Sequence, residues 1–231
     1  MKFILGIQVI FLAVTFSGKL NADVFESWEF KPVNGSLQET IAWFDQAKPL
    51  HEELGAKVEY WQHDVMGNNV IAYVMRFDSG DDWAVFKDKL AADEAWLSWF
   101  TDNYGTFSAN LMESFFVGNA FNTMAKSDIW DDINVIGFSA WEPVKGKPAT
   151  ICFESMQKSA EIQEKFGLNP TVYSSGLGPG YFMTGGKTWT EYQESRNKRN
   201  ESKEWTEYWT AAGENAPACD FVRQAFAVRV Q

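Results

Sequence analysis

His63 and Arg76 are two side chains that could do chemistry, and each lies in a run of residues typical of a β-strand. The ordinary pKa of a histidine is near neutrality, so His63 could act as a general base. The guanidinium of Arg76 could hold an oxyanion, and the indole of Trp61 could stack on a substrate ring. We therefore predict His63 and Arg76 as catalytic residues, with Glu59 and Trp61 as substrate-binding residues.

The spacing of these residues indicates that they share one face of a hairpin. Two β-type runs, 57–65 and 70–77, flank a Gly-Asn turn signal. Folding about that turn places Glu59 opposite Arg76, with His63 on the same face. The other face is more apolar, so we expect helices to cover it and the ionisable face to point into an enclosed space. The alternative is a cross-strand ion pair on an edge strand with a surface histidine, and a slip of one residue would turn the set outward.

The second half of the chain repeats the first. Three anchors recur in the same order at an offset of roughly 110 residues, which indicates an internal duplication. Each copy reads strand, helix, strand, strand, helix, strand. The anchors are Pro32-Val33 with Pro143-Val144, Leu54-Gly55 with Phe166-Gly167, and Trp96 with Trp205. The predicted organisation is a first repeat over 23–121, a polar linker over 122–131 and a second repeat over 132–231.

The last helix of each copy carries closely spaced aromatic residues. Single helices are predicted over 81–100 and 188–212. Their aromatic residues recur at i, i+3 and i+4, which is typical of the core stripe of an amphipathic helix. We expect core packing rather than ligand stacking for Trp96, Trp99, Phe100, Trp205, Tyr208 and Trp209.

A βαββαβ unit of this size is the ferredoxin-like pattern. Over nearly all of residues 23–231 the chain resembles the dimeric α/β-barrel superfamily, through element order, unit size, duplication and the pattern Gly-x-Lys/Asn-x-x-Tyr/Val around the hairpins. That superfamily includes antibiotic-biosynthesis-type monooxygenases, haem-degrading monooxygenases and NIPSNAP-like proteins. The resemblance implies an α+β fold, with two tandem ferredoxin-like units packed sheet to sheet as a pseudo-dimeric α/β barrel. No catalytic motif of any member is matched.

Such a barrel would hold a single site, built mostly from the first repeat. The hairpin of the second repeat carries no acid, base or histidine. Its inward residues would line the same space and complete the substrate-binding set. These residues are Tyr173, Ser175, Tyr181 and Met183.

Three functions are compatible with this site. The first is a small-molecule enzyme, which the resemblance suggests is a cofactor-independent monooxygenase or isomerase acting on an aromatic or quinone-like compound. The second is a non-catalytic envelope or ligand-binding protein whose barrel is packed. The third is haem binding, which we rank last because relatives that bind haem supply an axial histidine and only His51 and His63 are available. We expect no cofactor and no metal site.

The N-terminus and the composition restrict location and partners. Lys2 and the apolar run from Phe3 to Phe16 are typical of a secretory signal, with cleavage predicted after Ala22, so the protein is expected to be secreted or periplasmic. An uncleaved anchor is the alternative, although the run is short for a membrane span. The net charge of −11 disfavours nucleic acid as a partner. We expect a small-molecule ligand, no membrane contact after cleavage, and a monomer or weak homodimer.

Three further features depend on the fold. Cys152 and Cys219 should lie at the same end of the second sheet, where they would form a disulfide or remain buried thiols. The basic cluster at residues 196–199 is flanked by glutamates at helical spacing, so we interpret it as a solvated, ion-paired helix face. His51, near the end of a helix, is expected to be a cation favoured by the helix C-terminus.

Overall fold

The computed structural model describes residues 23–33, 36–63, 69–103, 105–119, 127–174, 179–214 and 218–230. The first repeat contains β1 (Val24–Pro32), α1 (Leu37–Glu53), β2 (Lys57–His63), β3 (Ile71–Phe77), α2 (Gly80–Ala92), α3 (Glu94–Asn103) and β4 (Ala109–Asn119). A 3₁₀ helix, η2 (Ser127–Asp132), precedes the second repeat. That repeat contains β5 (Val135–Pro143), α4 (Ala149–Glu164), β6 (Thr171–Ser174), β7 (Gly180–Gly186), α5 (Trp189–Glu201), α6 (Lys203–Glu214) and β8 (Cys219–Arg229).

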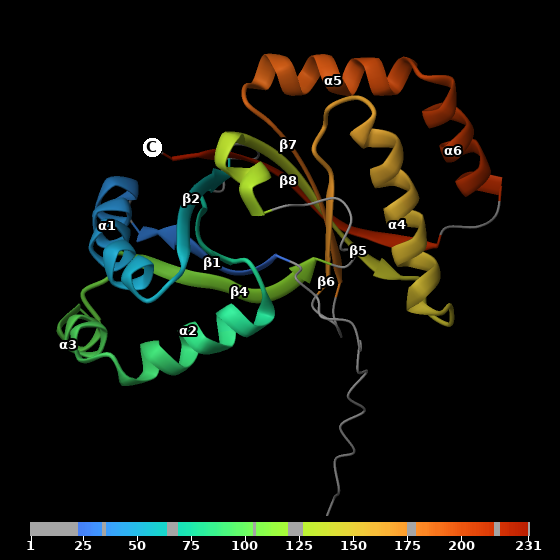
Figure 1. The fold of residues 1–231 in the computed structure, drawn as a ribbon. Helices are drawn as coiled ribbons and strands as arrows, with labels where there is room; N and C mark the ends of the chain where they lie inside the picture. The colour runs from blue at the N-terminus through green and yellow to red at the C-terminus, as the bar shows by residue number, and fades with distance from the viewer. Residues whose placement is uncertain are drawn as a thin grey trace, which may run out of the picture.

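The strands close into one antiparallel barrel in the order β1-β3-β2-β8-β5-β7-β6-β4. The two repeats meet twice, where β2 pairs with β8 and where β4 pairs with β6. The helices of the first repeat lie on one side of the barrel and those of the second repeat on the other (Figure 1). Each sheet therefore covers the bare face of the other. The predicted α+β fold, two ferredoxin-like units forming a pseudo-dimeric barrel, is confirmed.

The strand pairing is the same in both repeats. β1 pairs with β3, and β5 with β7, without any shift in register. A β-bulge interrupts the next ladder between Glu29 and Phe30 in β1, and between Ala140 and Trp141 in β5. Bulges are conserved features of a backbone rather than accidents. Corresponding positions of the two repeats can therefore be compared one by one.

The hairpin of the first repeat has a different register from the predicted one. Glu59 lies opposite Val74 rather than opposite Arg76, so the predicted register is wrong by two residues. The connection is longer than the expected tight turn, because the ladder still holds where the N–H of His63 donates to the carbonyl of Val70 at 2.9 Å. Side chains alternate along a strand, so an even shift leaves the same residues on each face.

The sequence predicts one long helix after each hairpin, but the structure has two shorter helices there, α2 and α3 in the first repeat and α5 and α6 in the second. Asp93 and Ser202 have extended backbones, with ψ values of 115° and 138°. Their side chains cap the helix that follows, since the N–H of Trp96 donates to Asp93 Oδ1 at 2.7 Å and that of Trp205 to Ser202 Oγ at 3.2 Å. The prediction of one continuous helix is therefore wrong at the same point in each repeat.

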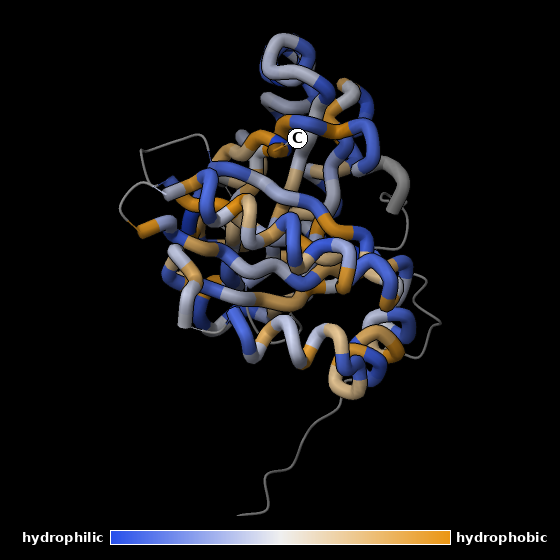
Figure 2. The backbone as a smooth tube through the Cα atoms, turned by 90° about the vertical axis from the view of Figure 1, so that its left-hand side faces the viewer, coloured by the Kyte–Doolittle hydropathy of each residue, from blue (hydrophilic) through white to orange (hydrophobic). Residues whose placement is uncertain are grey.

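Apolar side chains form one core inside the barrel and further cores between the barrel and the helices. Hydrophobic and hydrophilic residues alternate along the elements in Figure 2, as helices and strands with one buried face require. A disulfide between Cys152 and Cys219 ties α4 to β8. Within the described segments, none of the helices has the length and apolar character needed to cross a bilayer.

Candidate functional site

Arg76 lies inside the barrel with 2% of its side chain exposed. Its Nε donates to Glu59 Oε1 at 3.2 Å, and its Nη1 lies 3.7 Å from Asp23 Oδ2. The guanidinium also lies 4.4 Å from the ring centre of Trp130. Burial alone would lower the pKa of Arg76, but the nearby Glu59, Tyr173 and Asp23 raise it above the ordinary value. Arg76 is therefore a charged group already occupied by protein partners.

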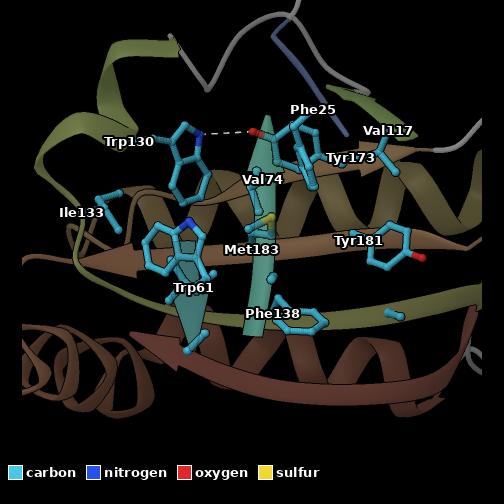
Figure 3. Close-up of a cluster of buried hydrophobic side chains, with 14 residues drawn as sticks. Phe25, Trp61, Val74, Val117, Trp130, Ile133, Phe138, Tyr173, Tyr181 and Met183 are labelled. Carbon is cyan, nitrogen blue, oxygen red and sulfur yellow. Dashed lines mark hydrogen bonds between the residues drawn. The ribbon is translucent and has the colours of Figure 1, made fainter. Parts of the chain in front are cut away.

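Tyr173 lies at the centre of this network. Its hydroxyl donates to Asp23 Oδ2 at 2.8 Å and accepts from Trp130 Nε1 at 3.1 Å (Figure 3) and from Arg76 Nη1 at 3.4 Å. Burial raises the pKa of both Asp23 and Tyr173. Trp130, which is fully buried, was missed by the sequence analysis because it belongs to the polar linker. An aromatic residue isolated in a polar segment was the available signal.

His63 lies near the other end of the barrel interior, beside a second ion network. Its Nε2 is 3.8 Å from Glu29 Oε1, and its ring centre is 5.6 Å from that of Phe138. Burial, with a contribution from Arg223, lowers the pKa of His63 to about 4. Arg223 in turn bridges Glu29 and Glu113, at 3.6 and 3.0 Å. The imidazole is therefore neutral at physiological pH.

The barrel interior is largely filled by side chains. Trp61, Tyr181 and Met183 point into it, as predicted, and pack with Phe138 and Tyr173 in one cluster (Figure 3). The space left beside His63 is about 40 Å³, which suits ordered water, whereas sites for small organic ligands occupy roughly 300–1,000 Å³. The predicted residues are thus brought together without room for an aromatic substrate. Ser175 lies outside the described residues.

A much larger pocket, of about 580 Å³, lies on the outer face of the second repeat. Its floor is the outer face of β5, β7 and β8, and its walls come from α4, α5 and α6, which surround that side of the barrel in Figure 1. We call it the α4–α6 pocket. Its lining includes Gly137, Ser139, Trp141, Met156, Gln163, Phe182, Tyr192, Arg196, Arg199, Trp205, Tyr208, Trp209, Cys219 and Phe221. The core packing expected for the aromatic residues of α6 is therefore wrong for this repeat.

The first repeat fills the corresponding space with large side chains. Trp28 and Trp83 both donate their indole N–H to Glu26, at 2.9 and 3.0 Å, and pack against the core beneath α1 and α2. The positions of Trp28 and Glu26 on β1 correspond to Ser139 and Gly137 on β5. Ser139 leaves open the space that Trp28 fills in the first repeat, whereas the Tyr192 hydroxyl occupies the space directly above Gly137.

His51 also fills this space in the first repeat. Its Nδ1 lies 2.7 Å from the Tyr73 hydroxyl, and its ring packs 4.4 Å from Trp96. Burial lowers the pKa of His51 to about 4, so the expectation that it is a cation is wrong. Gln163 holds the equivalent position in the second repeat, because His51 and Gln163 accept matching backbone hydrogen bonds at their helix ends. Sequence spacing could not reveal this burial.

Two arginines of α5 face the α4–α6 pocket. The guanidinium of Arg196 lies over the rings of Tyr192 and Phe226, at 5.7 and 5.5 Å. Arg199 stacks on Trp205 at 4.4 Å, and its Nη1 donates to Gln163 Oε1 at 2.6 Å. Burial and the neighbouring Arg196 lower the pKa of Arg199. The interpretation of this basic cluster as an ion-paired solvent face is therefore wrong for both arginines.

The pocket is poorly suited to haem iron. Its described lining contains no histidine, and its cysteine, Cys219, is held in the disulfide. The hydroxyls of Tyr192 and Tyr208 are bonded to Thr184 and Ser155, at 2.7 and 2.9 Å. Among the described residues, no three His, Cys, Asp or Glu converge as metal ligands do. An organic ligand fits this lining better than a metal centre.

Comparison with known proteins supports the fold rather than an activity. No family model matches the chain, and no characterised protein matches it in sequence. A proposed monooxygenase from Lactobacillus acidophilus is similar in structure, with a TM-score of 0.55 at 12% identity over 90% of this chain and 94% of that one. A proposed monooxygenase from Fusobacterium nucleatum gives 0.52 at 10% identity, over 91% and 93%. A proposed chlorite dismutase gives 0.54 at 7% identity, over 91% and 95%. The chain thus has the dimeric α/β-barrel fold, with its two units fused in tandem.

Proposed function

We propose that this protein binds a small organic molecule in the α4–α6 pocket and does not transform it. The observation that carries the proposal is the contrast between the repeats. The second repeat keeps about 580 Å³ open at the place where the first repeat packs Trp28, Trp83 and His51. That volume lies within the range of small-molecule sites, and aromatic and sulfur-containing side chains line it. A planar, mostly apolar ligand suits such walls.

The lining favours binding over catalysis. General acid–base catalysis needs a group that exchanges protons near neutral pH. The described lining offers no carboxylate and no histidine, and burial raises the pKa of Tyr192. His63 and Arg76, the candidate catalytic pair, lie inside the barrel and not in this pocket. Kinship with antibiotic-biosynthesis-type monooxygenases or NIPSNAP-like proteins, and oxygenation or isomerisation of an aromatic or quinone-like compound, stay predictions from the sequence resemblance.

We include export in this proposal. The predicted secretory signal supports it, and so does the Cys152–Cys219 disulfide, because disulfides persist mainly in oxidising compartments. A ligand-binding protein outside the cytoplasm would meet its ligand in the envelope or the medium. Fractionation of cells that express the full chain, followed by N-terminal sequencing, tests the location and the predicted cleavage after Ala22.

Binding can be tested with N-phenyl-1-naphthylamine, a neutral dye whose fluorescence rises in apolar sites. We expect saturable binding to the protein and loss of that binding in Ser139→Trp, which restores the side chain of the first repeat at this position. Ala212→Trp fills the pocket from α6 and should act alike. Ser114→Trp makes the same change as Ser139→Trp at an exposed site of β4 and should leave binding intact. Equal binding by all four proteins, each with an unchanged melting temperature, contradicts the proposal.

A further inference from the structure

The arginines of this chain divide by whether a carboxylate accompanies them. Three of the five point into the barrel and form ion pairs, namely Arg76 with Asp23 and Glu59, Arg223 with Glu29 and Glu113, and Arg229 with Glu59. The other two, Arg196 and Arg199, face the α4–α6 pocket. Within the described segments, neither forms an ion pair with a carboxylate. The chain has 31 acidic residues and a net charge of −11, so carboxylates are not scarce.

In the first repeat, the cation at the position of Arg196 forms an ion pair with a carboxylate. α2 and α5 are both 13 residues long and both begin after a capping hydroxyl, so Lys87 and Arg196 occupy the same helical position. Lys87 Nζ lies 3.2 Å from Glu26 Oε2 on β1. Gly137 replaces that glutamate on β5. The second repeat therefore has the cation without the carboxylate, and it has a second cation, Arg199, where the first repeat has Leu90.

Both guanidinium groups are held in place yet have donors to spare. Arg196 rests on two aromatic rings, and none of its N–H groups forms a hydrogen bond with a described residue. Arg199 is fixed by Trp205, Gln163 and Asn200. The two side chains are one helical turn apart on the same face of α5. Their mutual repulsion, which contributes to the lowered pKa of Arg199, is the kind of cost that a bound anion removes.

We propose that the ligand of the α4–α6 pocket is an organic acid, whose anionic group pairs with Arg196 and Arg199, the two arginines without a carboxylate partner among the described residues. Its planar apolar body lies among Tyr192, Trp205 and Tyr208. This inference rests on the proposed function and specifies the class of ligand. Guanidinium groups bind planar oxyanions with two parallel hydrogen bonds, which gives selectivity as well as affinity. The chain has a net charge of −11, so a site with two arginines and no carboxylate differs from the acidic remainder of the protein and would attract anions.

Two dyes that differ by one charge provide the test. 8-Anilinonaphthalene-1-sulfonate is the anionic counterpart of N-phenyl-1-naphthylamine. For each dye, binding is assigned to the α4–α6 pocket only where Ser139→Trp abolishes it. We expect Arg196→Gln and Arg199→Gln each to weaken binding of the sulfonate by about tenfold or more, as the loss of a charge-assisted hydrogen bond predicts, and to leave the neutral dye within about twofold. Lys198→Gln removes the same charge from an exposed site of α5 and should change neither.

The possible outcomes separate the two proposals. If both dyes bind in the pocket and the arginine variants retain full affinity for the sulfonate, the organic-acid inference is overturned and the binding function survives. If Ser139→Trp leaves both dyes unaffected, both proposals fail. If Arg199→Gln unfolds the protein, Arg196→Gln alone decides the test. That substitution removes no hydrogen bond to a described residue, so we expect it to fold. A melting temperature of Arg196→Gln equal to that of the parent validates the comparison.

Discussion

The hydroxyl of Tyr173 on β6 donates a hydrogen bond to the carboxylate of Asp23, 150 residues earlier in the chain, at 2.8 Å. This bond joins the second repeat to the residue that precedes β1, inside the barrel. Arg76 and Trp130 approach the same hydroxyl from β3 and from the segment between the repeats. Four parts of the chain therefore converge on one oxygen, which makes the barrel interior a structural junction rather than an open site.

Tyr173→Phe should destabilise the protein without changing the shape of its core. The ring of Tyr173 is kept, but Asp23 loses a donor while it stays buried beside Arg76. An unsatisfied buried polar group costs about 1–3 kcal/mol, so urea denaturation should show a loss of that size in the free energy of unfolding. A second variant, Trp130→Phe, removes one of the two donors to the Tyr173 hydroxyl and leaves the other, Arg76. Additive losses in the double variant would contradict the idea of one coupled network.

The histidines should titrate far below their usual range. His51 and His63 both have a pKa lowered to about 4, mainly by burial. A histidine whose folded pKa lies below its unfolded value of about 6.5 adds stability above pH 6.5, and that stability is lost as pH falls from 6.5 towards 4. The raised pKa of Asp23 and of Glu29 has the opposite effect on stability, because the folded state binds these protons before the unfolded state as the pH falls. The chain has two histidines, so NMR can follow each ring directly. A midpoint near 6.5 for either would show that its ring is solvated.

Much of the fold could be predicted from the sequence, because duplication and periodicity are local signals. The alternation of apolar and polar residues predicted β2 and β3 and the faces of their hairpin. The register was missed, since it depends on the geometry of the connection after His63. The breaks at Asp93 and Ser202 were visible in principle, as both are good N-cap residues inside an aromatic-rich helix.

The candidate site was harder to predict than the fold, because the pocket depends on the absence of a large side chain in the second repeat. The ionisable residues that stand out in the sequence lie in the barrel interior, where Glu59 and Arg76 pair with each other. The pocket exists in part because Ser139 is small where the first repeat has Trp28, whereas the Tyr192 hydroxyl fills the space above Gly137. A comparison of the two repeats position by position contains this signal. The volume itself follows only from how α4, α5 and α6 pack on the sheet.

Loss of the disulfide should weaken the second repeat. Cys152 and Cys219 are 67 residues apart, and the entropy of closing a loop of that size in the unfolded chain corresponds to about 4 kcal/mol. The double variant Cys152→Ala/Cys219→Ala should therefore unfold at lower urea concentration than the parent. Cys219 also lines the α4–α6 pocket, so dye affinity should fall with stability. Reductant should lower the urea midpoint of the parent towards that of the double variant and leave the midpoint of the variant unchanged. A parent whose midpoint does not change with reductant would contradict the expectation.

Gly137→Ala should disrupt the pocket floor through one methyl group. A Cβ at Gly137 would lie 2.3 Å from the Tyr192 hydroxyl, which is held by Thr184 at 2.7 Å. Since Tyr192 is buried between α5 and the sheet, relief requires α5 to move or the hydrogen bond to break. Overpacking of this kind costs about 1–3 kcal/mol, measured by urea denaturation, and dye affinity should fall as well. Gly80→Ala is the matched control, because a Cβ there meets nothing within 4 Å, and its effect should stay within about 0.5 kcal/mol. Equal stability of the two variants would show that Tyr192 does not rest on the sheet as described.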